Sequence, residues 1–215
     1  MPTAKSSRKP VPTAPARRPR DAVATRAAIL ESAHRAFVRL GYDGAGVREI
    51  AAGAGVTAML VNRYFGSKEQ LFAEVVVANM AQPIVLAPDN LHAALPQMGA
   101  RMAAALVGLT EAGSTPLDGF QIMLRSASSE RAAEIGREQI EQGHQRTLAA
   151  ALPGADAPLR AALVLALVAG VQVMRQMIGL KALAEVKPEV LVRLLAPLFQ
   201  QLLEGPNPQS TASAD

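Results

Sequence analysis

The chain contains 215 residues, of which 50% are hydrophobic and 19% are charged, and its formal net charge is +4. That length allows one medium-sized globular unit with a substantial core, or two small ones. Because the chain contains no cysteine, disulfide scaffolds, thiolate zinc sites and cysteine nucleophiles are excluded. Aromatic residues make up only 3% of the chain, which argues against an all-β sandwich. The abundance of alanine and leucine instead predicts an all-α protein.

Positive charge is concentrated near the N-terminus. Residues 1–20 contain six lysines or arginines, five prolines and no acid, so the remaining residues together carry a net charge of −2. This composition predicts a disordered basic arm over residues 1–20. Such an arm is suited to binding a polyanion such as DNA. A solvated leader that only aids solubility would have the same composition.

Three helices are predicted after the arm. Thr25 is a good N-cap for the first helix, and Gly41 ends it. The second helix covers 47–54 and stops at Gly55, and the third runs from its N-cap, Thr57, to about residue 65. Only about two residues separate the last two helices, as in a tight helical pair.

Helical periodicity continues to a polar tail over residues 205–215, which we expect to be disordered. Ser67 followed by Gln70 forms a capping-box pattern that opens the next helix. Caps and helix-breaking prolines divide the remainder. The predicted helical ranges are 67–80, 91–113, 116–124, 130–152, 157–180 and 188–204.

The longest apolar run covers residues 161–174, which is fourteen residues. A membrane-spanning helix needs about 20 apolar residues, so this run is interpreted as a core helix. The N-terminus shows no apolar stretch of the kind that a secretory signal requires. We therefore expect a cytoplasmic protein with no membrane contact.

The spacing between Val47 and Tyr64 is typical of a helix-turn-helix. Two short helices that cross steeply need a small residue at their closest approach, here Ala51, and a residue that tolerates positive φ in the turn, here Gly55. Apolar residues at the inward positions, Val61 among them, would lock the pair together. An ordinary helical hairpin with the same spacing is the alternative.

With Val61 placed inward, the helical rotation points Met59 and Arg63 outward and places Asn62 at their side. In a DNA major groove, Asn62 could pair with adenine, Arg63 with guanine or a phosphate, and Met59 with a thymine methyl group. Plain surface exposure is the competing interpretation of each. The residues predicted to contact DNA are Arg48, Thr57, Ala58, Met59, Asn62, Arg63, Tyr64 and Lys68.

Residues 25–76 resemble the TetR-type (TetR/AcrR) family of transcriptional regulators. The residues that carry the resemblance are Thr25-Arg26, Ile29-Leu30, Phe37, Gly41-Tyr42, Val47-Arg48, Ile50-Ala51, Ala54-Gly55-Val56-Thr57, Val61, Arg63-Tyr64-Phe65-Gly66-Ser67-Lys68-Glu69 and Leu71-Phe72. The resemblance implies a three-helix DNA-binding head over 21–68 and a six-helix ligand-binding and dimerisation body over 69–204. It also implies a homodimeric repressor that reads a palindromic operator and releases it on binding an unknown small-molecule effector.

Some positions depart from the family pattern. Ala45 and Gly46 stand where the family usually has two hydroxyl residues, Asn62 where it often has tyrosine, and Met59 where glycine is common. The operator sequence therefore cannot be taken from relatives. Residues 21–78, which are the head and the start of the helix that follows it, carry six basic and six acidic residues. Because they are net neutral, we expect the basic arm to supply affinity for DNA phosphates.

The predicted helices 157–180 and 188–204 are rich in apolar residues, and the first is apolar on nearly every face. Such a helix needs partners on two sides, and the resemblance implies a two-fold four-helix interface between copies. A purely internal core is the alternative. The residues predicted at the dimer interface are Leu163, Leu167, Val171, Met174, Leu191, Leu194, Leu198 and Leu202.

Methionines in the body supply adaptable apolar side chains that suit an accommodating pocket, although methionine at helical spacing is more often plain core. We expect the effector to be a largely apolar molecule. The residues predicted to line its pocket are Met98, Arg101, Met102, Phe120, Met123, Arg125, Met174 and Met177.

Two other functions have some basis in the sequence. The Glu-x-x-His pairs Glu31–His34 and Glu141–His144 are of the kind that di-iron helical bundles use, but the first lacks a glutamate on a preceding helix. A helical adaptor that binds only protein would use the helix-turn-helix as scaffold. The sequence contains no phosphate-binding glycine loop and no nucleophile elbow, so we expect no enzyme, metal or cofactor.

Overall fold

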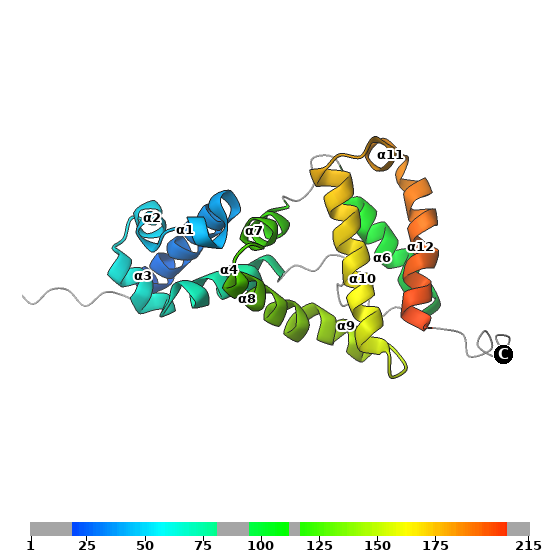
Figure 1. The fold of residues 1–215 in the computed structure, drawn as a ribbon, viewed down its shortest axis with the longest axis horizontal. Helices are drawn as coiled ribbons and strands as arrows, with labels where there is room; N and C mark the ends of the chain where they lie inside the picture. The colour runs from blue at the N-terminus through cyan, green and yellow to red at the C-terminus, as the bar shows by residue number, and fades with distance from the viewer. Residues whose placement is uncertain (1–18, 81–94, 112–116, 206–215) are drawn as a thin grey trace, which may run out of the picture.

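The computed structural model describes residues 19–80, 95–111 and 117–205, and within these ranges every regular element is helical (Figure 1). The all-α prediction is therefore confirmed. The α-helices are α1 (Pro19–Gly44), α2 (Val47–Gly53), α3 (Ala58–Phe65), α4 (Lys68–Met80), α6 (Leu95–Leu109), α7 (Asp118–Ser126), α8 (Glu130–Ile140), α9 (Arg146–Ala151), α10 (Ala157–Gln172), α11 (Lys181–Ala184) and α12 (Pro188–Glu204). Two π-helical turns, η1 (Glu141–Gln145) and η2 (Val173–Met177), follow α8 and α10.

Helix α1 begins earlier than the sequence predicted. It starts at Pro19, so Thr25 is an interior residue whose hydroxyl donates to the carbonyl of Asp21 one turn back, and the predicted N-cap is wrong. Proline suits the first helical position, and the alanine-rich stretch that follows favours continuation of the helix. The predicted stop at Gly41 is confirmed, because this residue has φ 68° and breaks the helical path.

The N-caps predicted for α3 and α4 are present. The Thr57 hydroxyl accepts from the backbone amide of Leu60, and the Ser67 hydroxyl accepts from the amide of Gln70. Gly55 has φ 66° in the turn between α2 and α3, a conformation that glycine adopts at little cost. These local contacts fix where α3 and α4 begin.

The predicted body helices are found with interruptions. The range 130–152 is helical from Glu130 to Ala151 but contains η1, and the range 157–180 ends at η2, before Gly179 with φ 70°. Helix α6 covers the middle of the range predicted as 91–113; its predicted start, and the start signal at 115–116, lie outside the described residues.

Two apolar clusters organise the described part of the chain. The first joins α1–α4 to Ile122 of α7 and to Ala132 and Ile135 of α8. The second joins α6, α9, α10 and α12 around Met102 and Phe199. Figure 1 shows α7 and α8 between the two groups. The head therefore packs directly on part of the body, and α7 and α8 are the helices that join them.

Two buried arginines hold the second cluster together. The Nη1 atom of Arg160 donates to the carbonyls of Leu202 and Leu203 at 3.0 and 2.9 Å, where α12 ends. The Nη1 atom of Arg175 donates to the Val107 carbonyl at 2.9 Å and to the Thr110 hydroxyl at 2.6 Å, where α6 ends. Helix C-termini carry unsatisfied carbonyls and partial negative charge. The ends of α12 and α6 therefore supply hydrogen-bond acceptors and a favourable potential for these two buried guanidinium groups.

Candidate nucleic-acid interface and head–body junction

Helix α3 presents one buried face and one exposed face. Val61 and Phe65 are buried in the first cluster, whereas Met59 is 79% exposed and Asn62 and Arg63 are also exposed. The four-residue spacing of the buried pair follows from the helical repeat. The side chains predicted to read bases therefore point away from the core.

The crossing of α2 and α3 is fixed by short backbone contacts. Ala51 is buried where the two helices meet, and its carbonyl accepts from the amide of Val56 at 2.9 Å. Gly55 lies between them with positive φ. The packing is that of a helix-turn-helix, in which the first helix supports the angle of the second.

A further contact, which sequence reasoning missed, supports the C-terminal end of α3. The Arg26 guanidinium lies 4.8 Å from the centre of the Phe65 ring and also pairs with Glu74 of α4. Arg26 thus ties α1 to α3 and α4 through one cation–π contact and one ion pair. In the sequence, Arg26 stands one turn before Ile29 and belongs to the residues that carry the family resemblance, and neither fact reveals this contact.

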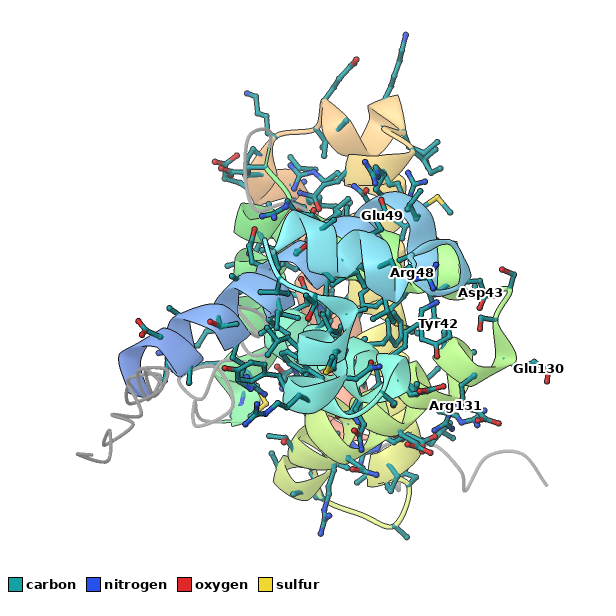
Figure 2. The ribbon with its side chains drawn as sticks, turned by 90° about the vertical axis from the view of Figure 1, so that its left-hand side faces the viewer. Tyr42, Asp43, Arg48, Glu49, Glu130 and Arg131 are labelled. Atoms are coloured by element: carbon teal, nitrogen blue, oxygen red, sulfur yellow. The ribbon has the colours of Figure 1, made fainter. Side chains whose placement is uncertain are left out.

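The other residues predicted to contact DNA differ in exposure. Arg48 is exposed on α2, as Figure 2 shows from the head end, and Thr57 is exposed at the start of α3. Ala58 and Tyr64 pack partly against the first cluster. The Lys68 ammonium lies 4.5 Å from the centre of the Tyr42 ring. The exposed members, Arg48, Thr57, Met59, Asn62 and Arg63, come from α2, α3 and the turn that joins them.

Tyr42 lies where the head meets α7 and α8. Its backbone amide donates to the buried Ser126 hydroxyl at 2.9 Å, and its ring packs edge-on against Phe72. Its phenol hydrogen-bonds to Glu69 of α4, and Arg131 of α8 also lies close to it (Figure 2). Four helices therefore converge on one residue.

Electrostatics at this junction follow from those contacts. Burial raises the pKa of the Tyr42 phenol, and the nearby Glu69 carboxylate raises it further. The Ser67 hydroxyl donates to the Glu69 carboxylate and lowers its pKa below the ordinary value near 4.5. Both groups therefore keep their usual charge states at neutral pH, with Tyr42 neutral and Glu69 ionised.

A cavity of about 380 Å³ adjoins the same junction, because Ser126 is among the residues that line it. It lies between the end of α7 and the helical stretch formed by α8 and η1. Its apolar lining includes Met123, Ala132 and Ile140. Four polar side chains also line it, namely Ser126, Arg137, Glu141 and Gln145. Because Ser126 also bonds Tyr42, one residue touches both the cavity and the head.

The structure does not bring the eight predicted pocket residues together. Only Met123 lines this cavity, and Phe120 is half-buried on the same helix. Met98 and Met102 are buried in the second cluster. The remaining four, Arg101, Arg125, Met174 and Met177, are exposed.

The predicted dimer residues divide by exposure. Leu163, Met174, Leu194 and Leu198 are exposed to between 44 and 59%, and Leu167 and Leu202 are half-buried. Val171 and Leu191 are buried within the chain. The stretch Ala157–Met177 is apolar and long enough to cross a membrane by composition alone, yet only 28% of its most apolar window is buried. A large apolar face therefore lies uncovered on α10, η2 and α12.

The di-iron alternative gains no support. The His34 Nε2 atom lies 3.1 Å from the Asn79 amide oxygen and 3.5 Å from Asp118, while Glu31 pairs with Arg35. Among residues 19–80, 95–111 and 117–205, no group of three or more histidines and carboxylates is placed to hold a metal ion.

Comparison with known proteins agrees with this geometry. Residues 29–75 match the family model described as "Bacterial regulatory proteins, tetR family", and residues 97–203 match the model described as "Tetracyclin repressor-like, C-terminal domain". The chain belongs to the TetR family. It is a DNA-binding transcriptional regulator with a helix-turn-helix head and a helical C-terminal domain. Family membership implies a regulator rather than an enzyme.

Individual relatives of this TetR-family regulator extend the comparison. The HTH-type transcriptional repressor SCO4008 of Streptomyces coelicolor is 37% identical over 76 residues, which are 34% of this chain and 40% of that protein. The match thus spans less than half the length of that relative. The TetR-family regulator SCO0857 of S. coelicolor A3 superposes with a TM-score of 0.58 at 25% identity, covering 88% of this chain and 99% of that one.

FadR of Bacillus subtilis in complex with stearoyl-CoA has the same fold. It superposes with a TM-score of 0.57 at 20% identity, and the match covers 83% of this chain and 99% of FadR. At this identity the likeness shows the fold alone, so the ligand of FadR is not transferred to this regulator.

Proposed function

We propose that this regulator is a cytoplasmic homodimeric repressor that binds a palindromic DNA operator and releases it when a small apolar effector binds. The DNA-binding part of this proposal rests on the outward face of α3, where Met59, Asn62 and Arg63 are exposed. On the opposite face, Val61 and Phe65 anchor the helix in the core. A capped and anchored helix with polar groups outside is the element that reads the major groove.

Each exposed group has a chemical partner in DNA. Asn62 matches the donor and acceptor pair of adenine, Arg63 matches guanine or a phosphate, and Met59 suits a thymine methyl group. The Thr57 hydroxyl and Lys68, at the starts of α3 and α4, suit phosphates. Arg48 on α2 is exposed and is suited to a phosphate contact as well.

The dimer half is supported by the uncovered apolar face. Leu194 on α12 and Leu163 on α10 are 59 and 46% exposed, and a second copy that packs the same face would bury both pairs of helices in a two-fold bundle. Two α3 helices held about 34 Å apart would then match successive turns of one DNA groove.

The DNA half is tested by selecting bound sites from a random duplex library with the purified protein. We expect an enriched palindrome that the Asn62→Ala, Arg63→Ala variant no longer selects, with a loss of about 1–3 kcal/mol for each base contact. The matched control is Gln142→Ala, Arg146→Ala, which removes an exposed amide and arginine from the body and should select the wild-type site. A dimer that enriches no sequence would contradict the proposal and favour the adaptor interpretation.

The effector half rests on the cavity beside α7. Its volume of about 380 Å³ falls within the range of small-molecule sites, and Met123 can adjust its shape because methionine is flexible. A Cβ added at Gly136 would lie 2.9 Å from the Met123 sulfur, so glycine leaves room there for that side chain.

The effector half can be tested with N-phenyl-1-naphthylamine, an apolar dye that fluoresces in dry sites. We expect it to bind the wild type and to weaken operator binding, with a reciprocal loss of dye affinity when operator is present. Ala133→Phe, which fills the cavity wall, should abolish the response and keep operator binding. Dye binding that leaves operator affinity unchanged would reject the cavity as the effector site.

A further inference from the structure

The cavity beside α7 contains a buried hydroxyl whose hydrogen-bonding capacity is only partly used. Ser126 lines the cavity and is buried, and its hydroxyl accepts from the Tyr42 amide at 2.9 Å. Within the part of the chain that the structure describes, no acceptor is found for the proton of this hydroxyl. A serine hydroxyl can donate one hydrogen bond while it accepts another. Ser126 can therefore donate to a molecule in the cavity without losing its bond to Tyr42.

Arg137 is a second donor in the cavity lining. It follows Gly136 on α8, which faces α7 so closely that an added Cβ there would lie 2.9 Å from the Met123 sulfur. Its guanidinium forms no ion pair or hydrogen bond with any residue of 19–80, 95–111 or 117–205. A guanidinium carries five N–H donors in a planar fork that matches a carboxylate. The cavity thus presents a positive charge that no neighbouring side chain neutralises.

These two donors belong to the same end of the cavity. Ser126 is the last residue of α7, and α8 begins four residues later at Glu130. Side chains on a helix lean toward its N-terminus, so we expect Arg137 to extend over Ala133, toward the connection between α7 and α8. Ala132, which lines the cavity near this connection, is fully buried. The donors therefore converge on the closed end.

Negative charge lies further along the same wall. Glu141 follows Arg137 by four residues, which is about 6 Å along a helix, and it is exposed. Gln145, another turn on, uses its Nε2 atom to donate to the Pro158 carbonyl at 3.1 Å. Solvent screens the charge of an exposed carboxylate. The cavity is consequently positive near Ser126 and negative toward η1.

We propose that this cavity binds a largely apolar molecule that carries one anionic group, such as a carboxylate, and that Ser126 and Arg137 donate hydrogen bonds to that group. The inference rests on the proposed function, because it assigns a chemical class to the effector of the same cavity. Met123 and Ile140 would pack against the apolar remainder of the molecule. A cationic ligand is less suited, since its charge would lie beside exposed Glu141 with Arg137 one turn away.

A matched pair of dyes isolates the anionic group. N-phenyl-1-naphthylamine and 1-anilinonaphthalene-8-sulfonate share one aromatic skeleton, to which the second adds a sulfonate. Fluorescence titration gives the affinity of each dye for the wild type, Arg137→Gln, Arg137→Lys and Glu141→Gln. The control is Arg146→Gln, which removes an exposed arginine outside the cavity lining. Ala133→Phe fills the cavity and so identifies the dye that is bound there.

Arg137→Gln should weaken the sulfonate dye about tenfold, because hydrogen bonds to charged groups are among the stronger ones, and should leave the neutral dye unchanged. Arg137→Lys should restore part of the loss. Glu141→Gln should strengthen binding of the sulfonate dye, since it removes a like charge. Arg146→Gln should alter neither dye.

Three outcomes would count against the inference or limit it. An affinity ratio of the two dyes that is the same in the wild type and Arg137→Gln would overturn it, as would weaker binding of the sulfonate dye to Glu141→Gln. If Ala133→Phe removes neither dye, the cavity is not a ligand site, and both this inference and the proposed effector site fail. If the sulfonate preference is found and neither dye alters operator affinity, the anion site is supported and only the effector role is rejected.

Discussion

The two apolar clusters differ in how they relate to the chain's functional surfaces. The first contains the whole helix-turn-helix and reaches into the body through Ile122 on α7 and Ala132 on α8. The second lies wholly in the body, and its helices α10 and α12 carry the uncovered face suited to a second copy. The first cluster thus connects α3 to the cavity, and the second supports the apolar face that the proposed dimer would bury.

In the proposed function, the first cluster is the part of the molecule through which an effector in the cavity would act on the head. Met123 packs against the first cluster and also lines the cavity. Ser126 lines the cavity and accepts the hydrogen bond from Tyr42. A molecule in the cavity would therefore touch residues that belong to the packing of the head, with no need for a relay through the second cluster. Substitutions in each cluster can test that separation.

The largest effect is expected where α7 enters the first cluster. Ile122 is 1% exposed, and Ile122→Ala should lower the free energy of unfolding by about 2–5 kcal/mol because it leaves a cavity in a packed core. Although Ile122 belongs to the body by sequence, the variant should also lose operator affinity. Urea unfolding and operator titration measure the two effects.

Leu106→Ala is the matched control in the second cluster. Leu106 is fully buried on α6, so its truncation should cost a similar free energy of unfolding. Operator affinity should be retained under conditions where the variant stays folded. Equal decreases of operator affinity in the two variants would show that the clusters do not act separately.

Gly41→Ala probes the contact between the ends of α1 and α7. Gly41 has φ 68°, and an added Cβ would lie 2.8 Å from the carbonyl carbon of Arg125. Positive φ costs a non-glycine residue about 1–2 kcal/mol, and the clash adds to it, so we expect a loss of about 2–4 kcal/mol. Thermal unfolding measures the effect.

Alanine substitutions at two other glycines distinguish the conformational cost of positive φ from the cost of the steric clash. Gly55 has φ 66° with nothing within 4 Å of an added Cβ, so alanine there should show the conformational cost alone. Gly46 has ordinary φ and open space, so alanine should be nearly neutral. If Gly41→Ala costs no more than Gly55→Ala, the close approach of α1 to α7 is not tight in solution.

Ser126→Ala removes the acceptor for the Tyr42 amide. The hydroxyl is buried, and leaving a buried donor unsatisfied costs about 1–3 kcal/mol. Ser128→Ala, at an exposed position two residues later, is the control and should be neutral. If the cavity is coupled to operator binding through this bond, Ser126→Ala should also reduce the effect of N-phenyl-1-naphthylamine on operator affinity. An unchanged effect of the dye would show that the bond takes no part in the coupling.

The features predictable from the sequence were those set by neighbouring residues. The Thr57 cap, the glycine turn at Gly55 and the spacing of Val61 and Phe65 each depend on a window of a few residues, and all are found. The start of α1 was misplaced because Thr25 is a good cap in isolation. Its hydroxyl bonds within a helix that the preceding alanine-rich turn extends.

Features that depend on residues distant in sequence were not predictable. Nothing local shows that Ile122 packs with the head, or that Arg26 meets Phe65, because these contacts join residues far apart in the chain. Methionine composition suggested a pocket but placed Met98 and Met102 in it, whereas both fill the second cluster. The number of methionines indicates that adaptable apolar side chains are present. It does not indicate whether a given methionine lines a pocket or fills a core.

The smallest effect on stability is expected at Glu69, in the first turn of α4 and close to Tyr42. Because its pKa is lowered by the Ser67 hydroxyl, the unfolded chain binds a proton more readily than the folded one, and stability falls as pH drops from the ordinary value near 4.5 through the lowered pKa. The Tm of the wild type should therefore exceed that of Glu69→Gln at pH 7, and the gap should close as pH falls through that window. In a Ser67→Ala background the gap at pH 7 should shrink, since the hydroxyl that favours the carboxylate is gone. A gap that stays constant from pH 7 to pH 3 would mean that glutamine disturbs packing around Tyr42, and that the charge of Glu69 does not stabilise the junction.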